Sequence, residues 1–203
     1  LSTYLRLLMD RTYICYVLSG ALIFAGLLTY VSGSPYVFIE LFHVSPERYG
    51  LYFGVNACGI MAASQTNRCL ATRVEARRIV GVVLSVAMTA SLVLLFDAYT
   101  GFGGFAGILV PLFCYIACHG FVLPNTTALA MAPHGKVAGS ASALLGTVQF
   151  VLASLTGALV AALANGTPVP LAAVIAGCGV LAFVSHHVGG RRSTALPSVG
   201  SAA

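Results

Sequence analysis

Residues 79–96 have the sequence IVGVVLSVAMTASLVLLF, a run without a single charge. A stretch of this length and composition is typical of a membrane-spanning helix, because about 20 apolar residues cross the hydrocarbon core of a bilayer. The whole chain shares this character: of its 203 residues 59% are hydrophobic and 7% charged, with a mean hydropathy of +0.95. Soluble domains are about 25% charged. The composition therefore excludes a soluble enzyme and a nucleic-acid-binding domain, and it predicts a polytopic membrane protein.

Short segments of polar and charged residues separate six apolar stretches in the chain. These stretches predict an all-α protein with six transmembrane helices. The expected bounds are 13–42 with an interruption at Ser34–Pro35, 49–67, 79–96, 105–130, 138–164 and 169–188. Each stretch is longer than a strand, and the alternating pattern of a membrane barrel is absent. The six-helix domain is thus expected over residues 13–188. Residues 1–12 are short and amphipathic, which favours an interfacial helix or the end of a cytoplasmic linker, and residues 189–203 favour a disordered cytoplasmic tail.

Basic residues predict the orientation, because the cytoplasmic loops of membrane proteins are enriched in Lys and Arg. With a cytoplasmic N-terminus, nine of the ten basic residues lie inside and only Arg48 lies outside. The nine inside residues are Arg6, Arg11, Arg68, Arg73, Arg77, Arg78, Lys136, Arg191 and Arg192. Both termini are therefore expected in the cytoplasm. The net charge of +5 is then a topology signal, and no nucleic-acid partner is needed to explain it.

Polar side chains at membrane depth are unevenly distributed among the predicted helices. The third and sixth helices contain nothing more polar than Ser and Thr, whereas the other four contain Tyr30, Asn56, Gln65, His119, Asn125 and Gln149. Such groups pair between helices or line a wet cavity. For any single residue an interhelical hydrogen bond is a sufficient explanation, but the pattern over four helices favours a polar cavity, with the third and sixth helices facing lipid. The candidate cavity contacts are Tyr30, Asn56, His119, Asn125 and Gln149.

Carboxylates are expected to be missing from the bilayer midplane. The part of the first helix that precedes Glu40 spans about 40 Å, which exceeds a hydrocarbon core of about 30 Å. Glu40 is therefore expected near the outer interface, beside Arg48, and Asp97 at the outer rim, after the third helix. Glu40 stays a candidate for proton coupling because it is the one carboxylate near an apolar run.

His119 is the one titratable group expected near the midplane, in the fourth helix. A His can relay protons or contact a substrate, and it can equally serve as a hydrogen-bonded residue between helices. It is the second candidate for proton coupling. Cys114 and Cys118 share a helix face with it, but a fourth ligand is missing, so no metal site is expected.

Small residues gather in the predicted fifth helix, as GSASA over residues 139–143 with Gly146, and again as Gly157 with Ala161. Surfaces of this kind let helix backbones approach closely. The pattern predicts tight packing, and sliding of this helix against a neighbour is compatible with it.

Two stretches resemble a known family. They are SGSPYVFIE at 32–40, followed by VSP at 44–46 and YG at 49–50, and PNTTALA at 124–130, followed by Pro133, Gly135, AGSASAL at 138–144 and Gln149. Together they closely resemble the C-terminal half of Bcr/CflA-type multidrug efflux transporters, which are drug:proton antiporters of the major facilitator superfamily. The resemblance extends from Tyr4 to His187.

The resemblance implies that the six helices are transmembrane helices 7 to 12 of the major facilitator fold, in which helices 9 and 12 pack outside and the other four approach the central cavity. It also implies a cytoplasmic gating loop between the second and third helices. The gating-loop candidates are Asn67, Arg68, Arg73, Arg77 and Arg78. This segment departs from the superfamily motif, because Asn67 stands where Asp is frequent and VEA at 74–76 replaces a Gly-containing turn.

The function implied is proton-coupled efflux of a small amphipathic drug across the bacterial inner membrane, driven by the proton gradient without a cofactor. The family's N-terminal six helices carry its main proton-linked acid, its membrane Arg and its antiporter glycine motif, and none of these maps onto this chain. The missing half and membrane lipid are thus the expected partners. An exporter of a metabolite such as an amino acid, and an inert truncated remnant, stay open as alternatives.

An enzyme or a channel is not expected. An intramembrane protease needs a Gly before the Ser19–Gly20 pair and a His at similar depth, whereas His186–His187 lie at the cytoplasmic end. A water channel needs Asn-Pro-Ala half-helices, but this chain has the reverse order, Pro124–Asn125.

Overall fold

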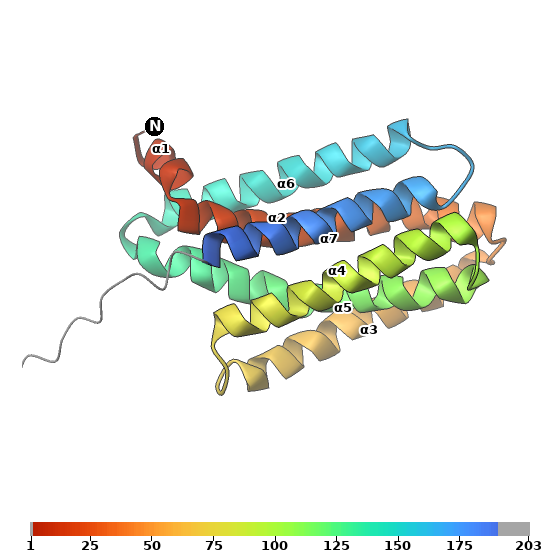
Figure 1. Ribbon diagram of the computed structural model, residues 1–203, viewed down its shortest axis with the longest axis horizontal. Coiled ribbons are helices and arrows are strands. Elements are labelled where there is room, and N and C mark those ends of the chain that lie inside the picture. The colour runs from red at the N-terminus through yellow and green to blue at the C-terminus, as the bar shows by residue number, and fades with distance from the viewer. Residues whose placement is uncertain (1, 191–203) are drawn as a thin grey trace, which may run out of the picture.

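A computed structural model gives the fold of residues 2–190 (Figure 1). These residues contain no strand, which confirms the all-α prediction. The elements in chain order are α1 (Ser2–Met9), α2 (Arg11–Pro35), the π-helix η1 (Tyr36–Leu41), α3 (Pro46–Leu70), α4 (Ala76–Thr100), α5 (Gly104–Met131), the 3-10 helix η2 (Ala132–Val137), α6 (Ala138–Ala162) and α7 (Val169–Gly190). The predictions for Arg191, Arg192 and the tail from residue 191 onward lie outside the described residues.

Six long helices follow the six predicted stretches, and their ends differ from the predicted ones by a few residues. Four segments are long and apolar enough to cross a membrane by length and composition, namely Arg11–Leu41, Ala76–Thr100, Gly104–Ala162 and Val169–Gly189. The third of these has 59 residues and contains both α5 and α6. One helix of that length would be about 90 Å long, so the segment crosses twice. The chain is a multi-pass membrane protein.

Helix α3 is the long helix that this composition test does not select. Its 25 residues reach about 37 Å, which is enough to cross the hydrocarbon core, but its apolar face is interrupted by amides and by Arg68. It lies beside α5 along the bundle (Figure 1). Its place as a span therefore follows from its packing and not from its hydropathy.

The bundle has α2 and α5 at its centre. Helices α4 and α7 cover them on one side, and α3 and α6 lie at opposite edges (Figure 1). The apolar core is built from α2, α4, α5 and α7, with Tyr30, Leu84, Tyr115 and Ile175 among its fully buried side chains. The edge helices bury little: α6 buries Ala141 and Ala153, and α3 buries four residues. Each edge helix is packed on one side and open on the other.

The predicted interruption at Ser34–Pro35 is corrected by the structure. The helix does not break there; it continues beyond Pro35 as η1, a wider turn in which Phe42 N–H donates to Val37 O at 3.1 Å. Proline lacks an N–H, and a local π-turn lets the surrounding backbone groups find partners. The chain leaves the helix at His43, which has a left-handed φ of 53°.

Helices α3 and α5 approach most closely at Gly120. A Cβ built there would lie 2.5 Å from Ile60 O and 2.9 Å from Ser64 N, both backbone atoms of α3 that cannot move aside alone. The Ser64 hydroxyl donates to Gly120 O at 3.4 Å across the same contact. The absence of a side chain at Gly120 is thus what lets α3 pack on α5.

We expect Gly120→Ala to destabilise the protein by about 1–3 kcal/mol, the usual cost of overpacking, because α3 must move away from α5. Gly54→Ala is the matched control, since Gly54 lies on α3 and a Cβ built there would have no atom within 4 Å. In a helix Ala is favoured over Gly by about 1 kcal/mol, so the control should be neutral or stabilising. Reversible unfolding in detergent measures both. Equal effects would show that the α3–α5 approach is looser than described.

Candidate functional site

Tyr30 and Asn56 join α2 to α3 inside the bundle. The Asn56 side-chain N–H donates to Tyr30 Oη at 2.9 Å, and the two side chains are 2% and 1% exposed respectively. The Tyr30 ring also stacks on Phe53, with ring centroids 5.9 Å apart. A second hydrogen bond, between the hydroxyl groups of Ser34 and Tyr49 at 3.0 Å, links the same two helices one turn further along α2. The structure thus brings together two of the predicted cavity residues, as partners of each other.

Asn125 and Asn67 join α5 to α3 in the same way. The Asn125 amide nitrogen donates to Asn67 Oδ1 at 2.6 Å and to Phe121 O at 2.7 Å. Both side chains are buried. Asn67 is predicted in the gating loop, but it lies on α3, because the helix continues to Leu70 with this amide packed against α5. The Asn67 side chain, at the position where the superfamily motif often has Asp, therefore points into the bundle.

The arginines of the gating-loop prediction surround the α3–α4 connection. Arg68 lies in the last turn of α3, Arg73 in the loop, and Arg77 and Arg78 in the first turn of α4. Arg68, Arg73 and Arg78 are exposed, whereas Arg77 is half-buried and in contact with its surroundings. The structure brings these cations together at one end of the bundle, and Glu75 precedes α4 between them.

His119 lies on α5, buried, with its ring centroid 6.1 Å from that of Phe24 on α2. Its Nδ1 has no hydrogen-bond partner among the described residues. Gln149 lies on α6, partly buried, at the opposite edge of the bundle from α3 (Figure 1). His119 and Gln149 are thus the predicted cavity residues outside the two side-chain pairs. Among residues 2–190, no group of three His, Cys, Asp or Glu side chains is placed to hold a metal ion.

Glu40 and Asp97 lie at the end of the bundle that carries η1. Glu40 is exposed on η1, at the same end of the bundle as Arg48 in the first turn of α3. The ion pair found among residues 2–190 joins Asp10 to His134 and involves neither residue. Asp97 does lie at the end of α4, but it is buried and accepts a hydrogen bond from Gly103 N–H at 2.6 Å. It therefore holds the α4–α5 turn, a role that its place in the sequence did not reveal.

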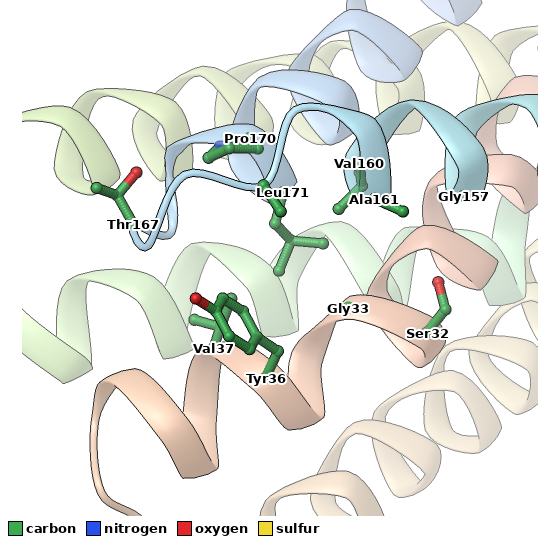
Figure 2. A pocket seen from close by; sticks show the side chains of 11 residues that line it. Ser32, Gly33, Tyr36, Val37, Gly157, Val160, Ala161, Thr167, Pro170 and Leu171 are labelled. Atoms are coloured by element: carbon green, nitrogen blue, oxygen red, sulfur yellow. The ribbon is translucent and has the colours of Figure 1, made fainter.

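A cavity of about 210 Å³ opens between α2 and the α6–α7 connection at this same end (Figure 2). Gly33 and Tyr36 line it from below, and Val160 and Leu171 from above (Figure 2). Drug-sized ligands occupy pockets of about 300–1,000 Å³. The cavity is thus too small to hold such a ligand alone, and none of the five predicted cavity residues lines it.

The small residues of α6 pack within the chain only in part, because Ala141 is fully buried and its carbonyl accepts the Tyr13 hydroxyl, whereas the glycines of the same stretch make no close contact. A Cβ built on Gly139 or Gly146 would have no atom within 4 Å, and Gly157 and Ala161 border the cavity. Close approach occurs instead at Gly120, and at Gly20, where a Cβ would lie 2.5 Å from the Thr126 hydroxyl of α5. Helix α6 thus packs on α2 through Ala141 and Ala153, while Gly139 and Gly146 have open space beside them.

Comparison with known proteins places the chain among transporters. No family model matches the sequence. The chain is 34% identical over 180 residues, 87% of its length, to the uncharacterised MFS-type transporter YdgK of Bacillus subtilis. It is 23% identical over 184 residues, 91% of its length, to a bicyclomycin resistance protein homologue of Haemophilus influenzae. The chain is a homologue of part of the MFS-type transporters.

The chain spans less than half of each relative, 44% and 46% respectively. This coverage is consistent with one half of a transporter, and it confirms the family resemblance drawn from residues 32–50 and 124–149. The first relative is named as a transporter, which also supports the prediction that the chain is not an enzyme.

We expect the Tyr30–Asn56 bond to stabilise the bundle measurably. In a double-mutant cycle of Tyr30→Phe and Asn56→Ala, the coupling free energy should be about 0.6–1.7 kcal/mol, the range of interhelical hydrogen bonds in membrane proteins. Thr66→Val replaces Asn56→Ala in the control cycle, because the Thr66 hydroxyl is exposed and bonds within α3 to Ala62 O. That cycle should be additive. Additivity in both cycles would contradict the pairing.

Proposed function

We propose that the chain forms one half of a proton-coupled antiporter that exports small amphipathic drugs across the bacterial inner membrane. The observation that carries the proposal is the similarity to a bicyclomycin resistance protein homologue along 91% of the chain. The drug:proton antiport of the Bcr/CflA family, which the motifs at residues 32–40 and 124–130 resemble, supports the same reading. The energy source is the proton gradient, and no cofactor takes part.

The charge distribution supports a cytoplasmic position for both termini. One end of the bundle carries seven of the eight basic residues of the described chain, and Arg48 lies at the other end. The seven are Arg6, Arg11, Arg68, Arg73, Arg77, Arg78 and Lys136. Because cytoplasmic segments are enriched in Lys and Arg, the end with α1 faces the cytoplasm and the end with η1 faces outward.

The open faces of α3 and α6 support a second six-helix half as the partner. Leu51 and Met61 on α3 are 70% and 63% exposed, and Phe150 and Leu155 on α6 are 62% and 60% exposed. Both relatives have more than twice the length of the matched region. The drug binds between the two halves near the bilayer midplane, so this chain supplies one wall of the site.

The side-chain pairs divide the candidate residues by role. Tyr30–Asn56 and Asn67–Asn125 are bonded to each other and so position α3 against α2 and α5, although the Asn56 amide oxygen has no hydrogen-bond partner among the described residues. His119 and Gln149 keep hydrogen-bonding capacity for a substrate or a proton. The proton gradient drives rocking of the two halves, and the arginines of the α3–α4 connection act at the cytoplasmic gate.

Split expression tests the proposal. An efflux-deficient bacterial host receives the chain alone, or the chain joined behind the part of the Bacillus subtilis relative that the chain does not match. We expect the joined protein to raise resistance to bicyclomycin and a protonophore to abolish the gain, whereas the chain alone gives none. Export by the chain alone would refute the half-transporter. Export of an amino acid without drug resistance would favour the metabolite exporter, and inactivity with a folded second half would favour an inert remnant.

We expect Glu40→Gln to leave export by the joined protein unchanged and His119→Gln to lower it severalfold. Glu40 is exposed at the end of the bundle, whereas His119 is buried within it. Gln keeps the approximate size of both side chains and removes the titratable group. Drug accumulation at two values of the proton gradient measures the effect. A loss of gradient dependence in Glu40→Gln alone would assign the proton coupling to Glu40 instead.

A further inference from the structure

Helix α1 has an apolar face that the bundle does not cover. Leu7 is buried against the start of α2 and the α5–α6 connection, which fixes α1 in place. On its other side Leu5, Leu8 and Met9 are 59%, 50% and 81% exposed. Residues three and four positions apart share one face of a helix, so these three side chains form one surface. A surface of this kind in contact with water would be unfavourable, but it suits the boundary of a bilayer.

A cavity of about 520 Å³ lies directly beside this face, where α1 turns into α2. Leu8, Ile14 and Val188 provide its apolar wall, and Arg11 and Thr12 provide its polar groups. It is enclosed by α2 and α7, which meet closely here: a Cβ on Gly189 would lie 2.5 Å from the Cβ of Cys15. Its volume is that of a ligand site.

The corner that holds Arg11 is fixed by Asp10. One Asp10 carboxylate oxygen accepts hydrogen bonds from the N–H groups of Thr12 and Tyr13, at 2.9 and 3.2 Å. The other lies 3.3 Å from Nε2 of His134 on η2. The acidic group next to Arg11 is thus engaged elsewhere, and within residues 2–190 no carboxylate forms an ion pair with Arg11.

The depth of the cavity follows from the length of the first span. The continuous segment Arg11–Leu41 has 31 residues and is about 46 Å long, so its ends extend beyond a hydrocarbon core of about 30 Å. Arg11 therefore lies at the level of the lipid headgroups, and Ile14, one turn further along α2, lies closer to the hydrocarbon core. The Arg11 cation lies at the depth of a phospholipid's phosphate, and the apolar side chains beside it lie on the side where the acyl chains extend.

We propose that this cavity, formed by α1, the start of α2 and the end of α7, binds an anionic phospholipid such as phosphatidylglycerol. The phosphate contacts the Arg11 guanidinium and the Thr12 hydroxyl, and one acyl chain lies along Leu8, Ile14 and Val188. The site is independent of the proposed transport function, because it needs neither the second half nor a drug.

Native mass spectrometry of the full 203-residue chain in detergent, titrated with dioleoyl phosphatidylglycerol or dioleoyl phosphatidylcholine, tests the site. Arg11→Gln should weaken phosphatidylglycerol binding about fivefold, the effect of one basic residue beside anionic lipid, and weaken phosphatidylcholine binding less, because the choline cation already neutralises that phosphate. Arg48→Gln, at the opposite end of the bundle, is the matched control and should bind as the parent chain does. An equal loss in both variants, or no loss in Arg11→Gln, would overturn the proposal.

Photocrosslinking gives a readout that does not depend on any variant. A phosphatidylglycerol with a diazirine on its acyl chain, incorporated with the full chain into nanodiscs, should label peptides containing residues 8–15 and 188–189 above all others. Excess phosphatidylglycerol should suppress this labelling, and excess inorganic phosphate should not. Labelling spread evenly over the lipid-facing helices would overturn the site, and suppression by inorganic phosphate would assign the cavity to a free anion.

Discussion

A polar group without a partner is unfavourable in a hydrocarbon medium, and this single constraint accounts for most of the molecule. Every backbone N–H and C=O at membrane depth must bond within its own segment, which leaves the helix as the element of an open chain. The same constraint acts on the side chains. Asn56 bonds to Tyr30 and Asn125 to Asn67, and hydroxyls throughout the helices donate to carbonyls three or four residues earlier, as Thr126 does to Val122.

These pairings explain why α3 belongs to the bundle although its hydropathy is the lowest of the long helices. Two amide-containing bonds hold it to α2 and α5, and the missing side chain at Gly120 lets it lie close to α5. Helix α3 also packs on α5 through Gly59 and Tyr52, but its apolar contact is smaller than those that hold α4 and α7. Its attachment is specific in register but limited in area.

The fold could be predicted from the sequence to a large extent, because hydropathy acts over whole helices: the run at residues 79–96 and its neighbours place six helices within a few residues of their bounds. The pairing of side chains could not, because it depends on which helix faces lie together. Asn56 and Tyr30 are 26 positions apart, and Asn67 and Asn125 are 58 apart. The family resemblance assigned Asn67 to the gating loop, although the predicted helix 49–67 already ended on it, and the sequence left the hydrogen-bond and cavity interpretations of the other amides undecided.

The packing of small residues could not be predicted from the sequence either. A glycine in a sequence permits a close approach, but whether a neighbour uses it depends on the packing of the whole bundle. Gly120 and Gly20 are used within this chain, whereas Gly139 and Gly146 on α6 are not. The unused glycines lie on α6, which packs within the chain through Ala141 and Ala153 instead, so the pattern predicted a packed helix without showing which of its small residues make the contacts. Helix α3 is joined to the centre by polar pairs, whereas α4 and α7 pack on the central helices through apolar side chains and still expose others, such as Val82 on α4 and Leu181 on α7.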